Sequence, residues 1–339
     1  MAEPIRLGIL GLSMGYSRAK IAKDYPNAVI GCVCSLNADR AETVAKEFDC
    51  AWTTSYEEML QRDDLDVIGV WTASGHHCLH ARMALEAGFN ALTTKPMDIR
   101  VEACKEAIAA AEKAGKTLAV DFGLRYQPKV RKVRKALAGG AIGKLLLADV
   151  LMKWMRPQDY YDGGEPKGWR SRLETEGGSI ANQGVHMVDE LYWLMGPVQR
   201  IEYGRFGTRA HDIESEDMCL GSLTFQNGAW GMIETTTSAF PDRGTRIEIN
   251  GTEGSVYLRG DEDIVIKRHD GEEVSLEDIT LDPDWPQHCF DDMYRVIRLG
   301  KTPACPGIEG MRSVEIFTGV YEAARTGEAV ELNQPPATC

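Results

Sequence analysis

The stretch Ile5-Arg6-Leu7-Gly8-Ile9-Leu10-Gly11-Leu12-Ser13-Met14-Gly15-Tyr16 decides the fold of this chain. Its apolar run predicts a buried strand over residues 5–10, and a helix is predicted from Tyr16 to Tyr25. The small residues between them would let backbone N–H groups approach a pyrophosphate at the start of that helix. Compared with G-x-G-x-x-G, Ser13 replaces the second glycine and Gly15 falls one residue before the third. Such a turn can also be an ordinary strand-to-helix turn without a ligand. The sequence that follows is needed to distinguish a dinucleotide-binding turn from an ordinary one.

The sequence after this turn alternates short apolar runs with helical stretches. Further strands are predicted at residues 28–34, 66–71, 91–93 and 117–120, and helices at 37–48, 80–87 and 101–114. Strands alternating with helices are typical of a doubly wound parallel sheet, whose ligands bind at the carboxyl ends of the strands. Residues 1–122 are therefore predicted to form a dinucleotide-binding Rossmann domain.

The pattern changes after residue 122. A basic helix is predicted at 128–137, and longer β-rich runs follow at 145–152, 218–225, 229–237, 245–250, 255–258 and 264–268. Turns such as Asn227-Gly228 and Asp270-Gly271 indicate hairpins. Helices are predicted at 186–195, 289–299 and 312–326. We therefore expect residues 123–339 to form an α+β domain with an open, mostly antiparallel sheet.

Composition excludes several classes of protein. The 339 residues include 38 Lys and Arg against 51 Asp and Glu, a net charge of −13, which disfavours nucleic acid and anionic membranes as partners. The sequence has no apolar run long enough to span a membrane and no signal-peptide pattern at its start. Its nine cysteines, among them Cys339, are scattered without C-x-x-C spacing. They are predicted to be reduced thiols of a cytoplasmic protein.

The residues that distinguish NAD from NADP are expected directly after the second strand. Ser35 stands there, and Arg40 lies one turn into the following helix; a hydroxyl and a guanidinium suit the 2′-phosphate of NADP. Two alternatives remain, since Asp39 could bind the ribose of NAD, or Arg40 could only cover an exposed helix face. NADP is predicted and NAD is possible. The predicted cofactor-binding residues are Gly11, Ser13, Met14, Gly15, Ser35, Arg40, Thr72, His77 and Lys95.

Two residues are candidates for the chemistry. Lys95 follows the fourth strand in Thr93-Thr94-Lys95-Pro96, where it could bind a substrate hydroxyl and stabilise an oxyanion. His186 follows a glycine-rich approach, and Asn182 and Asp189 are spaced to share one side of a helix with it. An imidazole there could exchange a proton with the hydroxyl. The alternatives are an ordinary strand-end lysine and a histidine that faces the core.

These motifs together resemble the glucose-fructose oxidoreductase and inositol dehydrogenase (Gfo/Idh/MocA) family over essentially the whole chain. The motifs are the glycine turn, Leu79-His80 with Ala84 to Gly88, Thr94-Lys95-Pro96, residues 140–143, Trp169-Arg170, and the segment from Gly177 to His186. The resemblance implies a Rossmann domain, a second domain whose open sheet often forms the oligomer interface, and NAD(P)-linked chemistry at a secondary alcohol of a sugar or cyclitol. It also implies a homodimer or homotetramer.

The resemblance assigns the family's lysine to Lys95 and its histidine to His186. Thr94 replaces the usual Glu before the lysine, and Asn182 stands where many members have Asp. The Asn-Gln-Gly-Val-His form is similar to that of amino-sugar or uronic-sugar dehydrogenases in the family, and the pair of Ser35 and Arg40 resembles the NADP-using members. An amide cannot accept a proton, so Asn182 is expected only to position substrate.

The expected mechanism places Lys95 and His186 on either side of the reacting hydroxyl, one of them taking its proton as hydride passes to the cofactor. Aromatic and basic side chains supply the predicted substrate contacts. These are Arg125, Tyr126, Lys153, Tyr160, Trp169, Arg170, Asn182 and His186. In His76-His77-x-x-His80 two imidazoles are spaced to share one helical face, as in some metal sites. No third ligand with suitable spacing is evident, so no metal is predicted.

Two other functions stay open at this stage. The first is an enzyme that cleaves or isomerises glycosides through a transient 3-keto sugar and recycles its cofactor. The second is a dinucleotide-sensing protein without catalysis.

Overall fold

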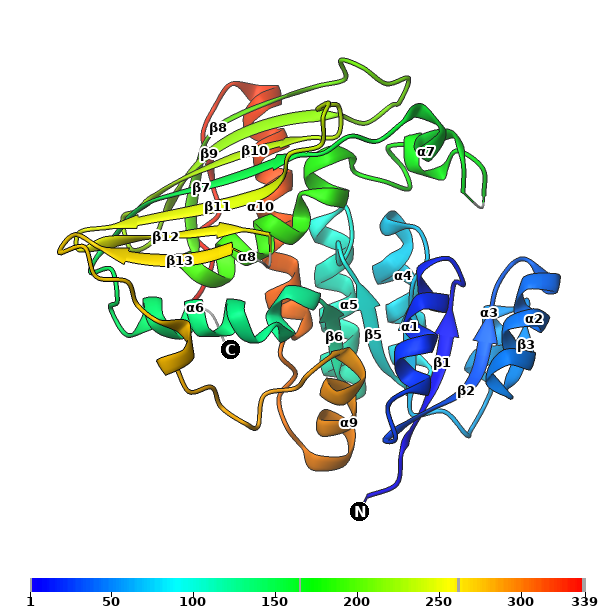
Figure 1. Ribbon diagram of the computed structural model, residues 1–339. Helices are drawn as coiled ribbons and strands as arrows, with labels where there is room; N and C mark the ends of the chain where they lie inside the picture. The colour runs from blue at the N-terminus through cyan, green and yellow to red at the C-terminus, as the bar shows by residue number, and fades with distance from the viewer. Residues whose placement is uncertain (1, 165, 261–262, 337–339) are drawn as a thin grey trace. The chain divides into compact units, whose positions relative to one another are not determined.

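A computed structural model describes residues 2–164, 166–260 and 263–336 (Figure 1). The chain forms two compact units: Met1–Tyr126 with Trp285–Met311, and Gln127–Asp284 with Arg312–Cys339. The first unit contains the region predicted to bind a dinucleotide. It also contains the return segment Trp285–Met311, which the sequence analysis placed in the second domain. The two units are described separately.

The first unit is built on a parallel sheet, as predicted. Within the described residues the sheet has six strands in the order β3-β2-β1-β4-β5-β6. They are β1 (Ile5–Leu10), β2 (Ala28–Cys34), β3 (Ala51–Thr53), β4 (Val67–Val70), β5 (Asn90–Thr94) and β6 (Leu118–Asp121). Strand β3 and the short helix α3 (Tyr56–Leu60) were not predicted from the sequence. None of the three residues of β3 is buried, so β3 lacks the apolar run by which a parallel strand is recognised.

Helices cover both faces of this sheet. They are α1 (Met14–Lys23), α2 (Ala38–Phe48), α4 (His77–Glu86), α5 (Val101–Ala114) and α9 (Cys289–Leu299). The side chain of Asn37 caps α2 by accepting the Arg40 N–H at 3.0 Å. Gly115 ends α5 in the left-handed region with φ 60°, as its sequence predicts.

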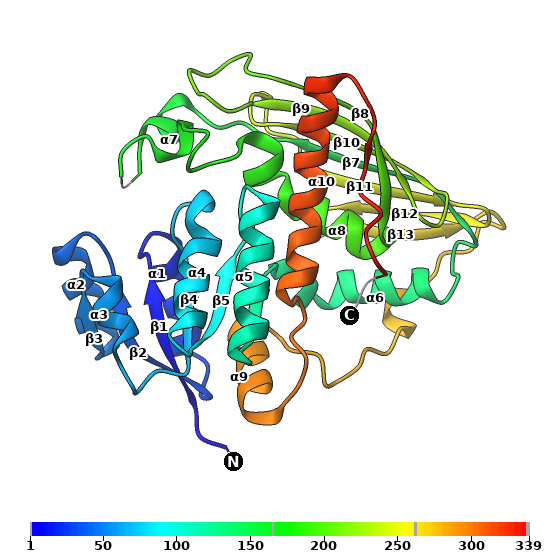
Figure 2. The same ribbon diagram turned by 180° about the vertical axis from the view of Figure 1, so that it is seen from behind.

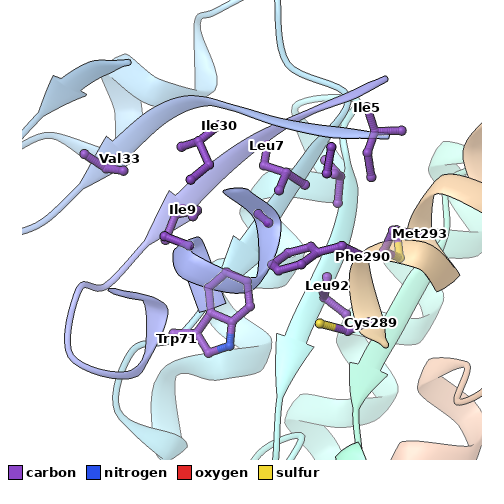
Figure 3. Close-up of a cluster of buried hydrophobic side chains, with 14 of the residues drawn as sticks. Ile5, Leu7, Ile9, Ile30, Val33, Trp71, Leu92, Cys289, Phe290 and Met293 are labelled. Carbon is purple, nitrogen blue, oxygen red and sulfur yellow. The ribbon is translucent and has the colours of Figure 1, made fainter. Parts of the chain in front are cut away.

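One apolar cluster explains why the return segment belongs to the first unit. Phe290 and Met293 of α9 pack with side chains of β1, including Ile9 (Figure 3). The ring of Phe290 lies 6.2 Å from the ring of Trp71, which follows β4. Burying such aromatic side chains contributes roughly 1.5–3 kcal/mol each to folding.

The second unit is built on a mostly antiparallel sheet, as predicted. Within the described residues it has eight strands in the order β13-β12-β11-β7-β10-β9-β8-β14, of which only the β7 and β10 pair is parallel. They are β7 (Leu145–Lys153), β8 (Val198–Gly207), β9 (Met218–Phe225), β10 (Trp230–Thr236), β11 (Gly244–Gly251), β12 (Gly254–Arg259), β13 (Asp263–Arg268) and β14 (Val330–Glu331). Strand β8 was not predicted from the sequence, because register shifts break its alternation at Val198/Arg200 and at Ile201/Tyr203.

Helices cover one face of this sheet (Figure 2). They include α6 (Pro128–Ala138), α8 (Val185–Met195) and α10 (Gly307–Thr326), while the short α7 (Gln158–Asp162) follows β7. A Cβ on Gly204 of β8 would lie 2.0 Å from the carbonyl oxygen of Val320, so only glycine lets α10 pack this closely. On the opposite face, β9 and β10 present exposed apolar side chains, among them Trp230 and Met232.

No helix in the described parts of the chain is long and apolar enough to cross a membrane. The described cysteines form no disulfide, and Cys339 lies outside the described residues.

Candidate functional site

The glycine turn after β1 has the geometry of a phosphate-binding loop. Gly11 has φ +86°, and its N–H donates to the Cys34 carbonyl at 2.9 Å. A Cβ on Gly11 would lie 2.4 Å from the carbonyl oxygen of Trp71, so no larger residue fits. Ser13 and Met14 are exposed at the start of α1, and Gly15 is buried against β1. The turn therefore offers the backbone donors at a helix N-terminus that suit a dinucleotide pyrophosphate.

Arg40 joins this turn from α2. Its Nε and Nη2 atoms donate to the Leu12 carbonyl at 3.0 and 2.5 Å. Ser35 lies directly after β2, where its hydroxyl accepts the Asn37 N–H at 3.2 Å. The structure thus brings Arg40 to the glycine turn, whereas Asp39 is exposed in the first turn of α2.

Lys95 lies at the carboxyl edge of the same sheet. It follows β5, which pairs with β4 on one side and β6 on the other, and the Lys95-Pro96 bond is cis. The Thr94 hydroxyl reaches the sulfur of Met14 at 3.9 Å, which links the end of β5 to the start of α1. Lys95 therefore lies on the edge to which the phosphate-binding turn also belongs.

His77 supports the turn that carries Lys95. Its ring is 1% exposed, with Nδ1 at 2.7 Å from the Pro96 carbonyl oxygen and Nε2 at 3.0 Å from the Thr72 carbonyl oxygen. Burial lowers the pKa of His77 to about 4, so its ring is neutral at neutral pH and donates to only one of these oxygens. Because both nitrogens face protein carbonyls, His77 is suited to acting on a cofactor through Thr72 and Pro96 rather than by direct contact.

Two buried carboxyl groups stabilise the carboxyl edge of this sheet, and neither was predicted from the sequence. The buried Asp121, at the end of β6, forms an ion pair with Arg18 of α1 at 2.8 Å. Asp98 accepts backbone N–H groups of Cys78, Ile99 and Arg100, and its burial raises its pKa to about 6. Neither residue belongs to a short motif, because each acts across segments distant in sequence.

The histidine cluster of α4 is engaged by protein groups. Besides the contacts of His77, Nδ1 of His80 lies 3.0 Å from the Thr72 hydroxyl, and burial lowers the pKa of His80 to about 4. In the described ranges no three His, Cys, Asp or Glu side chains form a group that could hold a metal.

In the second unit, His186 lies at the start of α8. A π-helical turn, Ser179–Gln183, precedes this helix. Every other residue of α8 is buried, whereas His186 is half-buried. The Gln183 amide donates to the Tyr160 hydroxyl at 2.8 Å and to the Asn182 side-chain oxygen at 2.9 Å.

Tyr160 connects this turn to two arginines. The guanidinium carbon of Arg170 lies 4.8 Å from the Tyr160 ring centre and 4.5 Å from that of Trp169. The guanidinium carbon of Arg156 lies 5.7 Å from the Tyr160 ring centre. The structure thus brings Tyr160, Trp169, Arg170 and Asn182 together, and it adds Arg156 and Gln183, which the sequence analysis missed.

Three other residues that were predicted to contact substrate instead contact carboxyl groups of the protein. Lys153 pairs with Glu234 at 2.9 Å on the sheet face opposite the helices. Arg125 is 1% exposed beside Glu309, and the buried Tyr126 hydroxyl donates to Asp292 at 3.1 Å. Burial raises the pKa of Asp292 to about 7. We do not carry these three residues into the proposed substrate site.

The strand order 3-2-1-4-5-6, the glycine turn after β1 and the polar groups at the carboxyl edge define a dinucleotide-binding Rossmann fold. The chain belongs to the Gfo/Idh/MocA family. The family profile described as "Oxidoreductase family, NAD-binding Rossmann fold" matches residues 5–122, and the "GFO/IDH/MocA C-terminal domain" matches residues 130–257. The resemblance stated from the sequence is confirmed.

Three relatives illustrate what the chain is similar to. The WlbA dehydrogenase from Bordetella pertussis, solved with NADH and UDP-GlcNAcA, is 30% identical with a TM-score of 0.86, covering 97% of this chain and 99% of that chain. The 1,5-anhydro-D-fructose reductase of Ensifer adhaerens is 27% identical, over 88% of this chain and 89% of the relative. The scyllo-inositol 2-dehydrogenase (NAD(+)) of Bacillus subtilis is 25% identical over 98% of each. The chain is thus similar to oxidoreductases named for acting on sugars and cyclitols.

Proposed function

We propose that this protein transfers hydride between NAD(P) and a secondary hydroxyl or ketone of a sugar, sugar derivative or cyclitol. The observation that carries the proposal is the position of Lys95, at the sheet edge that also holds the phosphate-binding turn. When bound, the nicotinamide supplies the hydride acceptor or donor. Lys95 binds the reacting oxygen and stabilises its developing charge, and His186 exchanges the hydroxyl proton. Asn182 positions the substrate.

An acidic sugar fits the arginines of the second unit. Within the described residues, no carboxylate lies within ion-pair distance of Arg156 or Arg170, although both guanidinium groups are stacked on Tyr160. Arginine binds carboxylate and phosphate groups through paired hydrogen bonds. The WlbA relative was solved with UDP-GlcNAcA, a sugar acid linked to a nucleotide. We therefore propose a uronic or nucleotide-linked sugar as the substrate class.

A substrate panel tests this function. Neutral sugars, inositols, free uronates, nucleotide-linked uronates and glycosides would be incubated with each cofactor, while reduced nicotinamide and released products are both followed. We expect cofactor reduction to be fastest with the acidic sugars. Product release without net change of cofactor would instead establish the glycoside-cleaving alternative. Cofactor binding without turnover of any member would favour a dinucleotide sensor.

NADP is the proposed cofactor, and Arg40 provides its test. One charge-assisted hydrogen bond contributes about 1.5–3 kcal/mol, so Arg40→Ala should lower kcat/KM for NADP by roughly 10-fold to 100-fold and leave that for NAD nearly unchanged. Steady-state kinetics with both cofactors measure this change. Lys46→Ala, on the same helix but paired with Glu42, is the matched control. A wild-type protein with higher kcat/KM for NAD would refute NADP preference.

We propose a homodimer or homotetramer formed through the exposed face of the second sheet. Trp230 is 68% and Met232 is 55% exposed at alternate positions of β10, and the exposed Leu220 and Met218 lie further along β9, opposite Glu234 and Thr236. Large apolar side chains exposed on one face of a sheet are typical of an interface between copies. We expect Met232→Glu to shift sedimentation toward the monomer. Leu299→Glu, at an exposed apolar position of the first unit, should not do so; an unchanged assembly in Met232→Glu would reject this face.

We also propose a cytoplasmic location, which rests on the scattered spacing of the cysteines in the sequence.

A further inference from the structure

The buried carboxyl group of Glu216 lies directly beneath the turn that leads to His186. Glu216 is 3% exposed and precedes β9. Its Oε1 accepts the Ile180 N–H at 2.9 Å and the Tyr321 hydroxyl at 2.9 Å, and its Oε2 lies 2.6 Å from the Ser179 hydroxyl. Its backbone carbonyl accepts the Ser179 N–H at 2.9 Å. One residue therefore holds the first two residues of the turn through both its side chain and its backbone.

The backbone around the turn is fitted to this carboxyl group. Gly178 has φ +85°, and a Cβ there would lie 2.7 Å from Oε1 of Glu216. From the turn, the Gly184 N–H donates to the Ser179 carbonyl at 2.7 Å, and the Val188 N–H donates to the Gly184 carbonyl at 2.9 Å. This continuous set of contacts connects Ser179 to the first turn of α8, which carries His186. A shift of Ser179 would therefore move His186.

The hydrogen bonds of Ser179 are compatible with a neutral carboxylic acid. The Ser179 hydroxyl lies 3.3 Å from the Thr235 carbonyl oxygen and 2.9 Å from the Thr235 hydroxyl. Ser179 can thus donate to Thr235 while it accepts the acid proton from Oε2 of Glu216. The same geometry would orient the carboxyl group without any positive partner.

The groups facing Glu216 are neutral or acidic. Tyr321 comes from α10, Cys219 comes from β9, and Asp217 is the next residue; Glu176, from the segment before the turn, lies near Tyr321. The nearby ring of His211 is bound to Asp217, at 3.0 Å. In the described residues, no Lys or Arg lies within ion-pair distance of the Glu216 carboxyl group. Burial without a cation favours the protonated acid, and it raises the pKa of Glu216 to about 8.

We propose that Glu216 is a positioning residue, whose neutral carboxyl group holds the Ser179–Gln183 turn and so places Asn182 and His186 for the reaction. The inference rests on the proposed function. Ionisation of Glu216 would put an unpaired charge in the interior and remove the acid proton. The Ser179 hydroxyl would then have to turn from Thr235 to donate to Oε2, so the turn would shift as pH rises. A glutamine would reproduce the neutral acid, because its oxygen can accept from Ile180 and Tyr321 and its amide can donate to Ser179.

Kinetics from about pH 6 to about pH 10 on the best substrate of the panel test the proposal. We expect wild-type kcat to fall at alkaline pH with an apparent pKa of about 8. Glu216→Gln should keep kcat at neutral pH within about threefold and lose this alkaline fall. Glu216→Ala should lower kcat by about 10-fold to 100-fold, because small displacements of catalytic groups are costly. Its affinity for the cofactor, measured by fluorescence titration, should persist.

The matched control is Asp292→Asn. Asp292 is the buried carboxyl group of the first unit whose pKa burial raises to about 7, so its removal tests whether any such group explains the alkaline fall. We expect the fall to remain in this variant. If Glu216→Gln retains the fall, or loses kcat as severely as Glu216→Ala, the neutral-acid role is wrong. Unchanged kcat in Glu216→Ala would reject positioning altogether.

A second measurement does not depend on turnover. In protein with isotope-labelled histidine, the NMR signal of His186 is assigned by its absence in His186→Asn. We expect this signal to shift with an apparent pKa of about 8 in the wild type and not in Glu216→Gln. The same shift in both proteins would overturn the inference. Failure of the whole substrate panel would count against the proposed function, whereas this NMR result decides the role of Glu216.

Discussion

Replacing Lys95 with alanine is expected to lower kcat by about 100-fold to 1000-fold, the usual cost of removing a donor that stabilises a developing oxyanion. Lys95 follows β5 at the carboxyl edge of the sheet, and the buried His77 lies against the Pro96 carbonyl beside it. Because the surrounding turn is held by His77 and Asp98, the loss of the ammonium group should not disturb the fold. Cofactor affinity should change by only a few-fold, since the proposed phosphate contacts come from the backbone of the glycine turn and not from Lys95.

The measurement for Lys95 is single-turnover hydride transfer, with a substrate deuterated at the reacting carbon. We expect an increased isotope effect in Lys95→Ala, because the chemical step then limits the rate. Lys105→Ala, at an exposed position of α5, is the control and should behave as wild type. If Lys95→Ala kept near-wild-type kcat with its fold intact, the catalytic assignment would fail.

Replacing His186 with asparagine is expected to lower kcat by about 100-fold to 10,000-fold, the range of general acid–base catalysis. Asparagine keeps a polar side chain on the half-buried position of α8 but cannot exchange a proton. The variant should also lose the part of the pH profile that reports the ionisation of His186. This second effect separates a lost proton carrier from a merely weakened helix.

The control for His186 is His269→Asn, at an exposed position after β13. It should leave both kcat and the pH profile unchanged. Full activity in His186→Asn, or a lowered kcat with the wild-type pH profile, would contradict the assignment of His186 as the proton-exchanging group.

The sequence predicted those parts of the fold that local pattern specifies. The bounds of α5 followed from its Ala-rich composition and the glycine after it, and the place of Lys95 at a strand end followed from the buried run before Thr94-Lys95-Pro96. By contrast, β8 was missed because its bulges interrupt the alternation of buried and exposed residues. Such irregularities depend on pairing with β9, which local sequence does not contain.

Long-range contacts limited how much of the candidate site could be predicted from the sequence. Arg125 and Tyr126 carry suitable chemistry, yet Glu309 and Asp292 engage them from residues far along the chain. Glu216 stands in no motif, and only the fold reveals that it lies beneath the turn before His186. Residue type and spacing therefore indicated the candidate chemistry, whereas the supporting residues required the structure.

The return segment Trp285–Met311 has a consequence for how the chain folds as it is made. Phe290 and Met293 complete the apolar cluster around β1, so the first unit lacks part of its core until most of the chain has left the ribosome (Figure 3). A nascent fragment that ended near Tyr126 would expose Ile9 and Trp71 to water, and exposed apolar surfaces of this kind promote aggregation and chaperone binding. The first unit is therefore the first to begin synthesis but cannot be completed until strands β7 to β13 of the second unit have been translated.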